Sequence, residues 1–249
     1  MSQTPAPIDP WPALRAVTSA RIGLGRCGDA LPTAETLALQ LAHARARDAI
    51  HDRVDFPALA LRLAPLKCIE VKSAAADRAT YLRRPDLGRQ LEQESREKLT
   101  EQPCDVVFVV GDGLSSAAIA HHAEPVIREC LQRLKHLNVG PIVLAENARV
   151  ALGDEIGRLI GAKLVVVLIG ERPGLSSPDS LGIYITWDPK PGRKDSERNC
   201  ISNVHSNGMS YAEAGERVQE IVEAALRQRA TGVIAQTRNV AALPATARN

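Results

Sequence analysis

The chain of 249 residues has few of the features that mark metal-binding or disulfide-rich proteins. Its five cysteines are odd in number and widely spaced, and no two of them form a CxxC pair. Cys and His residues do not occur together at the spacing of a zinc site. The sequence therefore indicates neither a disulfide framework nor a zinc site, and we expect reduced, mostly buried thiols.

An excess of charge of one sign is also lacking, because 31 basic and 29 acidic side chains leave a formal net charge of +2. This balance gives no electrostatic basis for binding nucleic acid or an anionic membrane. The longest apolar runs, Val106–Val110 and Leu164–Ile169, are far shorter than a membrane span. The opening residues MSQTPAPIDPWPAL lack a basic segment followed by an apolar one, so we expect no signal peptide.

Apolar residues make up 45% of the chain and charged residues 24%, as in globular proteins. The length suits one large domain or two modest ones. The sequence pattern changes near Gln102–Cys104, where we place the boundary between regions 1–102 and 103–249.

Region 1–102 is predicted to be helical and to contain no strand. Thr33 opens TAETLALQLAHARARDAIHDRV, whose apolar residues recur at helical spacing. A second helix is predicted between Asp55 and Pro65. A third, polar helix is predicted to begin at Asp86 and to continue over LGRQLEQESREKLTEQ.

Region 103–249 alternates between short apolar runs and helical segments. Because the runs are apolar throughout, they predict strands that are buried on both faces. The chain is therefore predicted to be an α/β protein, with a doubly wound, mainly parallel sheet preceded by a helical N-terminal region. The predicted strands are 105–110, 141–144, 164–169 and 181–187, and the predicted helices are 115–137, 154–160 and 210–230.

The string Gly23-Leu24-Gly25-Arg26-Cys27-Gly28 matches the GxGxxG pattern of dinucleotide-binding loops. That fingerprint needs a buried strand directly before it and a helix that begins within it, so that backbone N–H groups face a pyrophosphate. The preceding RAVTSARI is polar, and Pro32 delays the helix. A Gly-rich turn explains the pattern better, with a partner-contacting loop as an alternative.

The segment from Lys163 to His205 is the strongest candidate for a ligand site. Its buried strand ends at Gly170 in a loop rich in Pro, Gly and Ser. Ligands of α/β sheets bind at the carboxyl ends of strands, so we expect Glu171 or Arg172 to face a ligand, unless they pair with each other or with solvent.

The string GDGLSS at 111–116 forms a similar strand–loop–helix junction. Its glycines would admit a ligand close to the backbone, and the helix N-terminus would favour anionic groups. An ordinary turn with a serine cap explains it equally well.

Cys200 and His205 could form a nucleophilic dyad, but no third residue that would orient the imidazole is evident. A packing thiol or a compact ligand contact explains Cys200 better. The string NVHSNG at 203–208 differs by one residue from DxHxxG, the motif that places His on cobalt in many cobalamin domains. Asn203 lacks the charge that tunes this imidazole, so we expect His205 to be an ordinary core or surface histidine.

Six strings together resemble the small (light) subunit of ethanolamine ammonia-lyase. They are ARIGLGRCG, LPTAETLALQLAHARARDAIH, DGLSSAAI, VALGDEIG, LVVVLIGERPGLSSPDSLGIYITW and ERNCISNVHSNGMSYAEA. The likeness extends from about Asp9 to Arg227, and its most specific part is the block 163–212.

This resemblance implies a subunit of an adenosylcobalamin-dependent enzyme that converts ethanolamine to acetaldehyde and ammonia. The family's large subunit, a (β/α)8 barrel, would hold ethanolamine and perform the radical chemistry. This chain would form a Rossmann-like lid, with region 1–102 on the large subunit and region 103–249 on the cobalamin. No catalytic residue and no metal ligand is expected in it.

Three cofactor contacts of the family transfer to this sequence: Val150 in RVALGDEIG, Glu171 in LIGERPGL and Cys200 in RNCISN. Val150 would present an apolar wall, Glu171 an acceptor for corrin amides, and Cys200 a small contact. The family keeps the nucleotide base of cobalamin on cobalt, which argues further against His205 as an axial ligand.

Two other classes of function remain open. One is a non-enzymatic, doubly wound module that binds a nucleotide or another cofactor, and the other is a hydrolase that uses Cys200 and His205. Neither explains the long resemblance. We expect a cytoplasmic location, with the interior of a bacterial microcompartment as an alternative.

Overall fold

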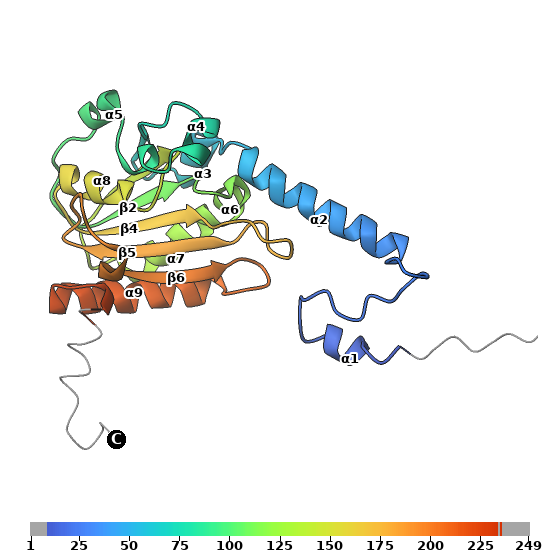
Figure 1. Ribbon diagram of the computed structural model, residues 1–249. Helices are drawn as coiled ribbons and strands as arrows, with labels where there is room; N and C mark the ends of the chain where they lie inside the picture. The colour runs from blue at the N-terminus through green and yellow to red at the C-terminus, as the bar shows by residue number, and fades with distance from the viewer. Residues whose placement is uncertain (1–8, 234, 236–249) are drawn as a thin grey trace, which may run out of the picture.

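A computed structural model describes residues 9–233 and 235, which form a six-stranded sheet in the order β1-β3-β2-β4-β5-β6, shown in Figure 1. Strands β1 to β4 are parallel, whereas β5 is antiparallel to β4, and β6 is antiparallel to β5. The strands are β1 Cys68–Lys72, β2 Cys104–Gly111, β3 Val139–Glu146, β4 Ala162–Gly170, β5 Leu181–Trp187 and β6 Arg198–Val204. The α/β class is confirmed, but the sheet is mixed.

The mixed sheet corrects the expectation of a mainly parallel one, which holds for β1 to β4 alone. The loops 171–180 and 188–197 are shorter than the dozen or more residues that a parallel crossover needs. The chain therefore turns back on itself twice after β4. The segment before His205, where no strand was predicted, is the edge strand β6.

Strand β1 is a second correction, because no strand was predicted in region 1–102. It pairs with β3 from Cys68↔Ile142 to Lys72↔Glu146 and forms the other edge of the sheet. Region 1–102 therefore contributes to the same sheet as the rest of the chain. The division of the chain at residue 102 remains a prediction.

Most of the predicted helices are confirmed. The helical segments are α1 Pro12–Arg15, α2 Thr33–His51, α3 Phe56–Leu63, α4 Arg78–Arg83, η1 Leu87–Arg89, α5 Gln93–Glu97, α6 Ser116–Ala118, η2 Ile119–Ala123, α7 Glu124–Arg133, α8 Leu152–Ile160, η3 Asp195–Glu197 and α9 Tyr211–Gln228. The segment η2 is a π-helix that joins α6 to α7. Within the described residues, no helix has the length and apolar character needed to cross a membrane.

The long helix predicted from Asp86 is wrong, because η1 and α5 are separated by an extended segment around Leu91. The backbone of this segment bonds to the end of β1: Ala74 N donates to Gln90 O at 2.8 Å, and Glu92 N donates to Lys72 O at 3.0 Å. Leu91 is buried. Pairing with the sheet edge replaces the helical hydrogen bonds at this point.

Helices cover both faces of the sheet, with α9 on one side and α8 on the other in Figure 1. Alternate residues of β2 enter different cores, because successive side chains of a strand point to opposite faces. Phe108 packs in the core that includes residues of α7 and α9, and Val109 packs in the core that includes residues of α8. The strands between these cores are apolar throughout for this reason.

A buried ion pair ties the edge strand β6 to α8. Both terminal nitrogens of Arg198 contact the two carboxylate oxygens of Asp154, at 2.6 and 2.7 Å. Arg198 also donates to Thr186 Oγ1 at 2.9 Å. Because both charged side chains are almost completely buried, each depends on the other for its partner.

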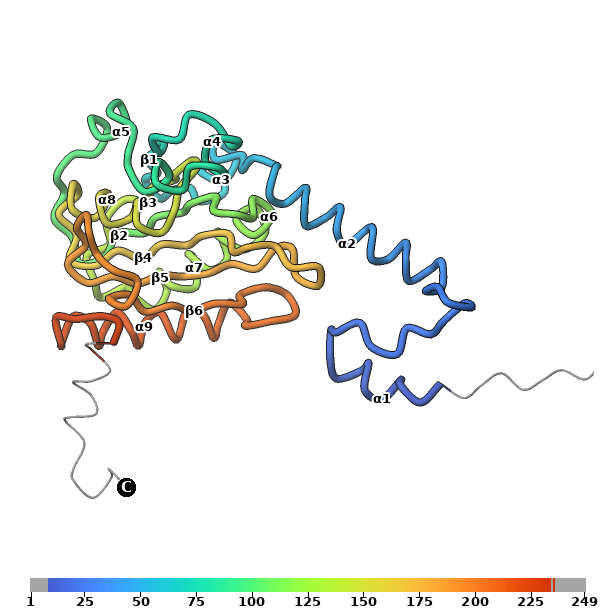
Figure 2. The backbone as a smooth tube through the Cα atoms, viewed as in Figure 1, coloured from blue at the N-terminus to red at the C-terminus, as the bar shows by residue number. Residues whose placement is uncertain are grey.

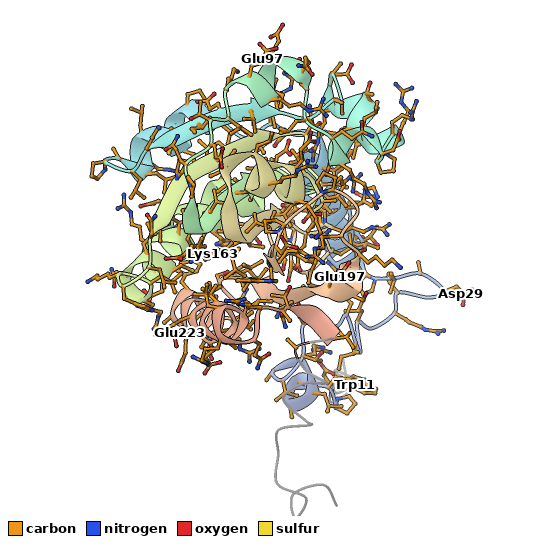
Figure 3. All side chains as sticks on the ribbon, turned by 90° about the vertical axis from the view of Figure 1, so that its left-hand side faces the viewer. Trp11, Asp29, Glu97, Lys163, Glu197 and Glu223 are labelled. Carbon is orange, nitrogen blue, oxygen red and sulfur yellow. The ribbon has the colours of Figure 1, made fainter. Side chains whose placement is uncertain are left out.

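Residues 9–51, which we call the arm, extend away from the sheet and its covering helices, as Figures 1 and 2 show. Helix α2 is attached at its C-terminal end, where Ser116 Oγ donates to Ala49 O at 3.1 Å and Arg78 Nε donates to Ile50 O at 2.7 Å. Figure 3 shows Trp11 and Asp29 on the far part of the arm. The arm exposes several large apolar side chains: Trp11, Leu14, Val17, Leu31, Leu37, Leu39 and Leu41.

The GxGxxG string lies in this arm as an irregular, largely exposed turn. Residues 16–26 contain no strand, and the next helix begins only at Thr33. The geometry of a dinucleotide-binding loop is therefore absent from this turn, and its interpretation as a Gly-rich turn is confirmed.

Candidate functional site

The turns that follow β2, β3 and β4 meet at the end of the sheet where the parallel strands have their carboxyl ends. They surround a cavity of about 300 Å³. Its lining residues are Tyr81, Gly113, Leu114, Arg149, Val150, Ile169, Gly170, Glu171, Arg172 and Tyr184. Two of the three predicted cofactor contacts, Val150 and Glu171, are in this set, and we call it the edge cavity.

The turns after β2 and β4 touch backbone to backbone at Gly113 and Gly170. Gly113 has a φ of +58°, and a Cβ placed there would lie 2.3 Å from Gly170 O. A Cβ on Gly170 would lie 2.1 Å from Ser115 O. Side chains at either position would force the two turns apart, so these glycines are needed for packing as well as for lining the cavity.

Asp112 fixes the neighbouring turn after β3. Its carboxylate accepts hydrogen bonds from Asn147 N at 3.0 Å and Ala148 N at 2.9 Å, and it pairs with Arg78 Nη1 at 3.3 Å. Burial raises the pKa of Asp112 to about 6, against the opposing effect of Arg78 and the backbone donors. The group is therefore still ionised at neutral pH and holds Val150 in place through the turn.

Val150 lies in this turn, just before α8, and packs partly against the core on the α8 face. Beside it, the Arg149 guanidinium stacks on Tyr81, 4.3 Å from the ring centroid. The Tyr81 hydroxyl in turn donates to Ala148 O at 3.1 Å. Arg149 Nε is buried and has no hydrogen-bond partner among the residues that the structure describes.

Glu171 is the first residue after β4 and is half-buried. Its carboxylate accepts from Ser180 Oγ at 2.5 Å and from Asn203 N at 3.3 Å. The alternative interpretation, an ion pair between Glu171 and Arg172, is not found among the described residues. These contacts bring the ends of the 171–180 loop together and hold the carboxylate at the cavity wall.

Cys200 lies beside the edge cavity, on β6. It lies opposite Tyr184 in the β5–β6 register, and it is not itself one of the lining residues of the cavity. Burial raises the pKa of the Cys200 thiol, and the Glu171 carboxylate raises it further. Burial also raises the pKa of Tyr184. Val150 and Glu171 thus line the edge cavity, and Cys200 lies on the strand next to it, paired with the lining residue Tyr184.

The sequence did not single out Tyr81, Arg149 or Tyr184. Tyr184 had a signal, since it alternates with Ile183 and Ile185 in the strand LGIYITW and must therefore face away from their core. Tyr81 and Arg149 are brought together by the packing of α4 beside the turn after β3, which no local pattern reveals.

The hydrolase alternative requires contact between Cys200 and His205, and none occurs among the described residues. His205 Nε2 lies 2.8 Å from Asn203 Oδ1, and its Nδ1 accepts from Asn207 N at 3.3 Å. Both ring nitrogens are therefore used within the histidine's own turn. His205 is a buried residue of this turn, as the sequence suggested.

A larger hollow of about 500 Å³ lies at the opposite end of the sheet, where β2 and β3 begin. Its lining is Pro65, Leu66, Lys67, Gln102, Pro103, Cys104, Leu131, Asn138, Val139, Gly140, Pro141 and Ile142. None of the three predicted cofactor contacts lines this hollow, and it lies away from the carboxyl ends of the strands. The edge cavity is the better site candidate for these reasons.

Replacing Arg78 should test the pair that shapes the edge cavity. Arg78→Ala leaves Asp112 buried without its cation, so we expect a loss of about 3–5 kcal/mol in the free energy of unfolding, measured with urea. Arg83→Ala, on the exposed side of the same helix, should change it by about 0.5 kcal/mol or less. Equal effects of the two changes would contradict the role given to the pair.

The raised pKa of Cys200 should be visible in its reactivity. Because only the thiolate is nucleophilic, Cys200 should react with iodoacetamide more slowly at pH 7 than a thiol in an unstructured peptide. Its rate should still be rising above pH 9. The measurement is peptide mapping by mass spectrometry, with Cys200→Ser to assign the signal. A fast rate that levels off between pH 6 and 8 would instead indicate an activated thiolate.

Comparison with known proteins shows the family of this chain. The family model described as ethanolamine ammonia-lyase light chain (EutC) matches residues 8–235. The ethanolamine ammonia-lyase small subunit of Bradyrhizobium diazoefficiens is 48% identical over 241 residues, which cover 94% of this chain and 92% of that protein. The protein of the same name from Azotobacter vinelandii is 48% identical over 93% of this chain and 89% of its own length.

The ethanolamine ammonia-lyase small subunit of Rhodopseudomonas palustris is 51% identical over 227 residues, which cover 88% of this chain and 87% of that protein. Each of these matches covers 87% or more of both proteins. The family model, over residues 8–235, includes the arm, the sheet and the edge cavity. The chain belongs to the ethanolamine ammonia-lyase light-chain family.

Proposed function

We propose that this chain is the small subunit of an adenosylcobalamin-dependent ethanolamine ammonia-lyase and that it holds the corrinoid against a catalytic large subunit. The observation that carries the proposal is that Val150 and Glu171 line one cavity and that Cys200 pairs with Tyr184 of the same lining. The relatives are named small subunits of ethanolamine ammonia-lyase, which supports ethanolamine as the substrate, ammonia as a product and a large subunit as the partner. Acetaldehyde as the second product follows from the family resemblance.

The order of the strands supports a ligand at this edge. β3 and β4 lie on opposite sides of β2, so the connections after β2 and β3 lead in opposite directions. In doubly wound α/β folds, ligands bind in the crevice where the strand order reverses in this way. Gly113, Val150 and Gly170 surround that point. The proposal of a Rossmann-like fold applies to the parallel strands β1 to β4.

The residues of the edge cavity fit the edge of a corrinoid. Val150 and Tyr184 offer apolar surface, and the Glu171 carboxylate can accept hydrogen bonds from corrin amides. Arg149 Nε, which has no partner in the described part of the chain, can donate to an amide carbonyl. A cavity of about 300 Å³ is at the lower limit for a drug-sized ligand. It can therefore take only one side of a corrinoid, as expected if a second subunit covers the remainder.

In this arrangement the chain binds and orients, and the bound cofactor supplies the radical that starts the reaction. Glu171 is suited to orientation because Ser180 and Asn203 already fix its carboxylate. Cys200 remains a thiol at neutral pH because burial raises its pKa, so it can contact the corrin without acting as a nucleophile. The turns on either side exclude water from this wall of the site.

We assign the contact with the large subunit to the arm. Its exposed apolar residues, among them Trp11, Leu37 and Leu41, offer apolar surface to a partner, and gathered apolar surface is typical of protein–protein interfaces. The arm also lies against the 171–180 loop at two points, where Arg21 and Ser19 approach Leu175 and Ser176 at 3.5 Å. Docking of the arm and closure over the corrinoid would therefore involve the same part of the chain.

The division of labour can be tested with the full chain and its large subunit. The chain alone should not deaminate ethanolamine in the presence of adenosylcobalamin, and addition of the large subunit should give activity. Activity of the chain alone, or no activity of the pair, would refute the proposal. Spectral titration of the two subunits together with cobalamin, NAD and ATP distinguishes the proposal from its alternative. The proposal predicts binding of cobalamin, whereas a nucleotide-binding module would bind NAD or ATP.

A double change in the arm, Leu37→Asp with Leu41→Asp, tests whether the arm binds the large subunit. It should reduce co-purification with the large subunit, because it places charge in the apolar surface. Arg45→Glu, an exposed change on the same helix, should not reduce it. Unchanged co-purification of the double variant would move the contact away from the arm.

Replacing Glu171 tests the cofactor site itself. In the assembled complex, Glu171→Ala should weaken equilibrium binding of hydroxocobalamin about tenfold, the loss expected for one charge-assisted hydrogen bond. The readout is the cobalamin absorbance spectrum. Glu216→Ala, an exposed glutamate of α9, should bind as the wild type does. Unchanged binding by Glu171→Ala would remove this residue from the site.

A further inference from the structure

Two histidines and an aspartate meet outside the edge cavity, on the other side of the 171–180 loop. His121 Nδ1 and His122 Nε2 each lie 3.2 Å from the same carboxylate oxygen, Oδ2 of Asp179. The three ligand atoms all lie within 4.8 Å of one another. No other group of three such side chains with this geometry occurs among the described residues. None of the three lines the edge cavity.

The local backbone explains how two consecutive histidines reach one oxygen. In an α-helix, consecutive side chains are separated by about 100° around the axis, so they normally point to different neighbours. His121 and His122 lie in the π-helix η2, whose wider turn reduces this angle. Single π turns of this kind are frequent at functional sites.

The contact distances suit a metal ion as well as hydrogen bonds. Zinc–nitrogen and zinc–oxygen bonds of about 2.0–2.1 Å place two ligands of a tetrahedral ion about 3.3 Å apart. The two nitrogen–oxygen distances of 3.2 Å match this edge length. Two imidazoles and one carboxylate are also a ligand set that zinc accepts, with a fourth position left open.

A neighbouring side chain orients the buried histidine. The Tyr211 hydroxyl lies 2.8 Å from His122 Nδ1, which directs Nε2 towards Asp179. Metal-bound histidines usually have such a partner on the second nitrogen. His122 is almost completely buried, so packing together with the Tyr211 contact limits the orientations that its imidazole can adopt.

We propose that His121, His122 and Asp179 bind a divalent transition-metal ion of the zinc class. The ion ties the 171–180 loop, which begins at Glu171, to the helix after β2 and through Tyr211 to the start of α9. No spacing pattern in the sequence indicates this site, because His122 and Asp179 are 57 positions apart. The site is independent of the proposed function.

The test uses the full chain freed of metal with a chelator. Zn²⁺ should bind at one tight site per chain by isothermal titration calorimetry, and Co²⁺ should give the visible spectrum of a tetrahedral ion. His121→Ala is the main variant, because its side chain is 61% exposed and the fold should tolerate the change. It should weaken Zn²⁺ binding at least tenfold. His43→Ala, an exposed histidine of the arm, is the matched control and should bind as the wild type does.

A second measurement tests the tie to the loop. Zn²⁺ should slow hydrogen exchange of residues 171–180 in the wild type and leave it unchanged in His121→Ala. Equal Zn²⁺ affinity of the wild type and His121→Ala, as binding to the free cysteines would give, overturns the proposal. Failure of the wild type to take up Zn²⁺ or Co²⁺ at micromolar concentration overturns it as well, and leaves a hydrogen-bonded cluster only.

Discussion

The shape of the candidate site depends on one buried carboxylate. Asp112 accepts hydrogen bonds from Asn147 N and Ala148 N and pairs with Arg78, which also binds Ile50 O at the end of the arm. One side chain thus connects the turns after β2 and β3 with α4 and the arm. Its burial is unfavourable for the charge, which is why its pKa is raised to about 6. The donors around it offset that cost and fix Val150 in place.

The sequence predicted the centre of the sheet well and its edges poorly. Strands β2, β3, β4 and β5 are buried on both faces, so each is a continuous apolar run that local pattern recognises. The edge strands β1 and β6 mix polar with apolar residues, as CIEVK and RNCISNV show. Such segments resemble connections until their pairing partners are known. The mixed direction of the sheet followed from loop length, which the composition of the strands does not reveal.

Three residues of the candidate site could be predicted from the sequence, but the neighbouring side chains that complete its surface could not. Val150, Glu171 and Cys200 came from the family resemblance, and the position of Glu171 after a buried strand also came from general rules for α/β sheets. Tyr184 enters the site through its register with Cys200, and Tyr81 through its stacking with Arg149. These depend on which strands and turns become neighbours. Their roles in binding a corrinoid remain predictions, whereas their proximity is a property of the fold.

The string GDEIG beside Val150 shows why a distinctive motif need not be the site itself. A Cβ on Gly153 would lie 2.4 Å from Val167 Cγ2, so this glycine lets α8 approach β4 closely. Asp154 binds Arg198 of β6, and Glu155 accepts from Leu91 N beside β1. The helix thereby joins both edges of the sheet to its centre. Because α8 cannot move without breaking these contacts, the turn directly before it is held rigid, and that rigidity makes Val150 a suitable wall for a large, flat ligand.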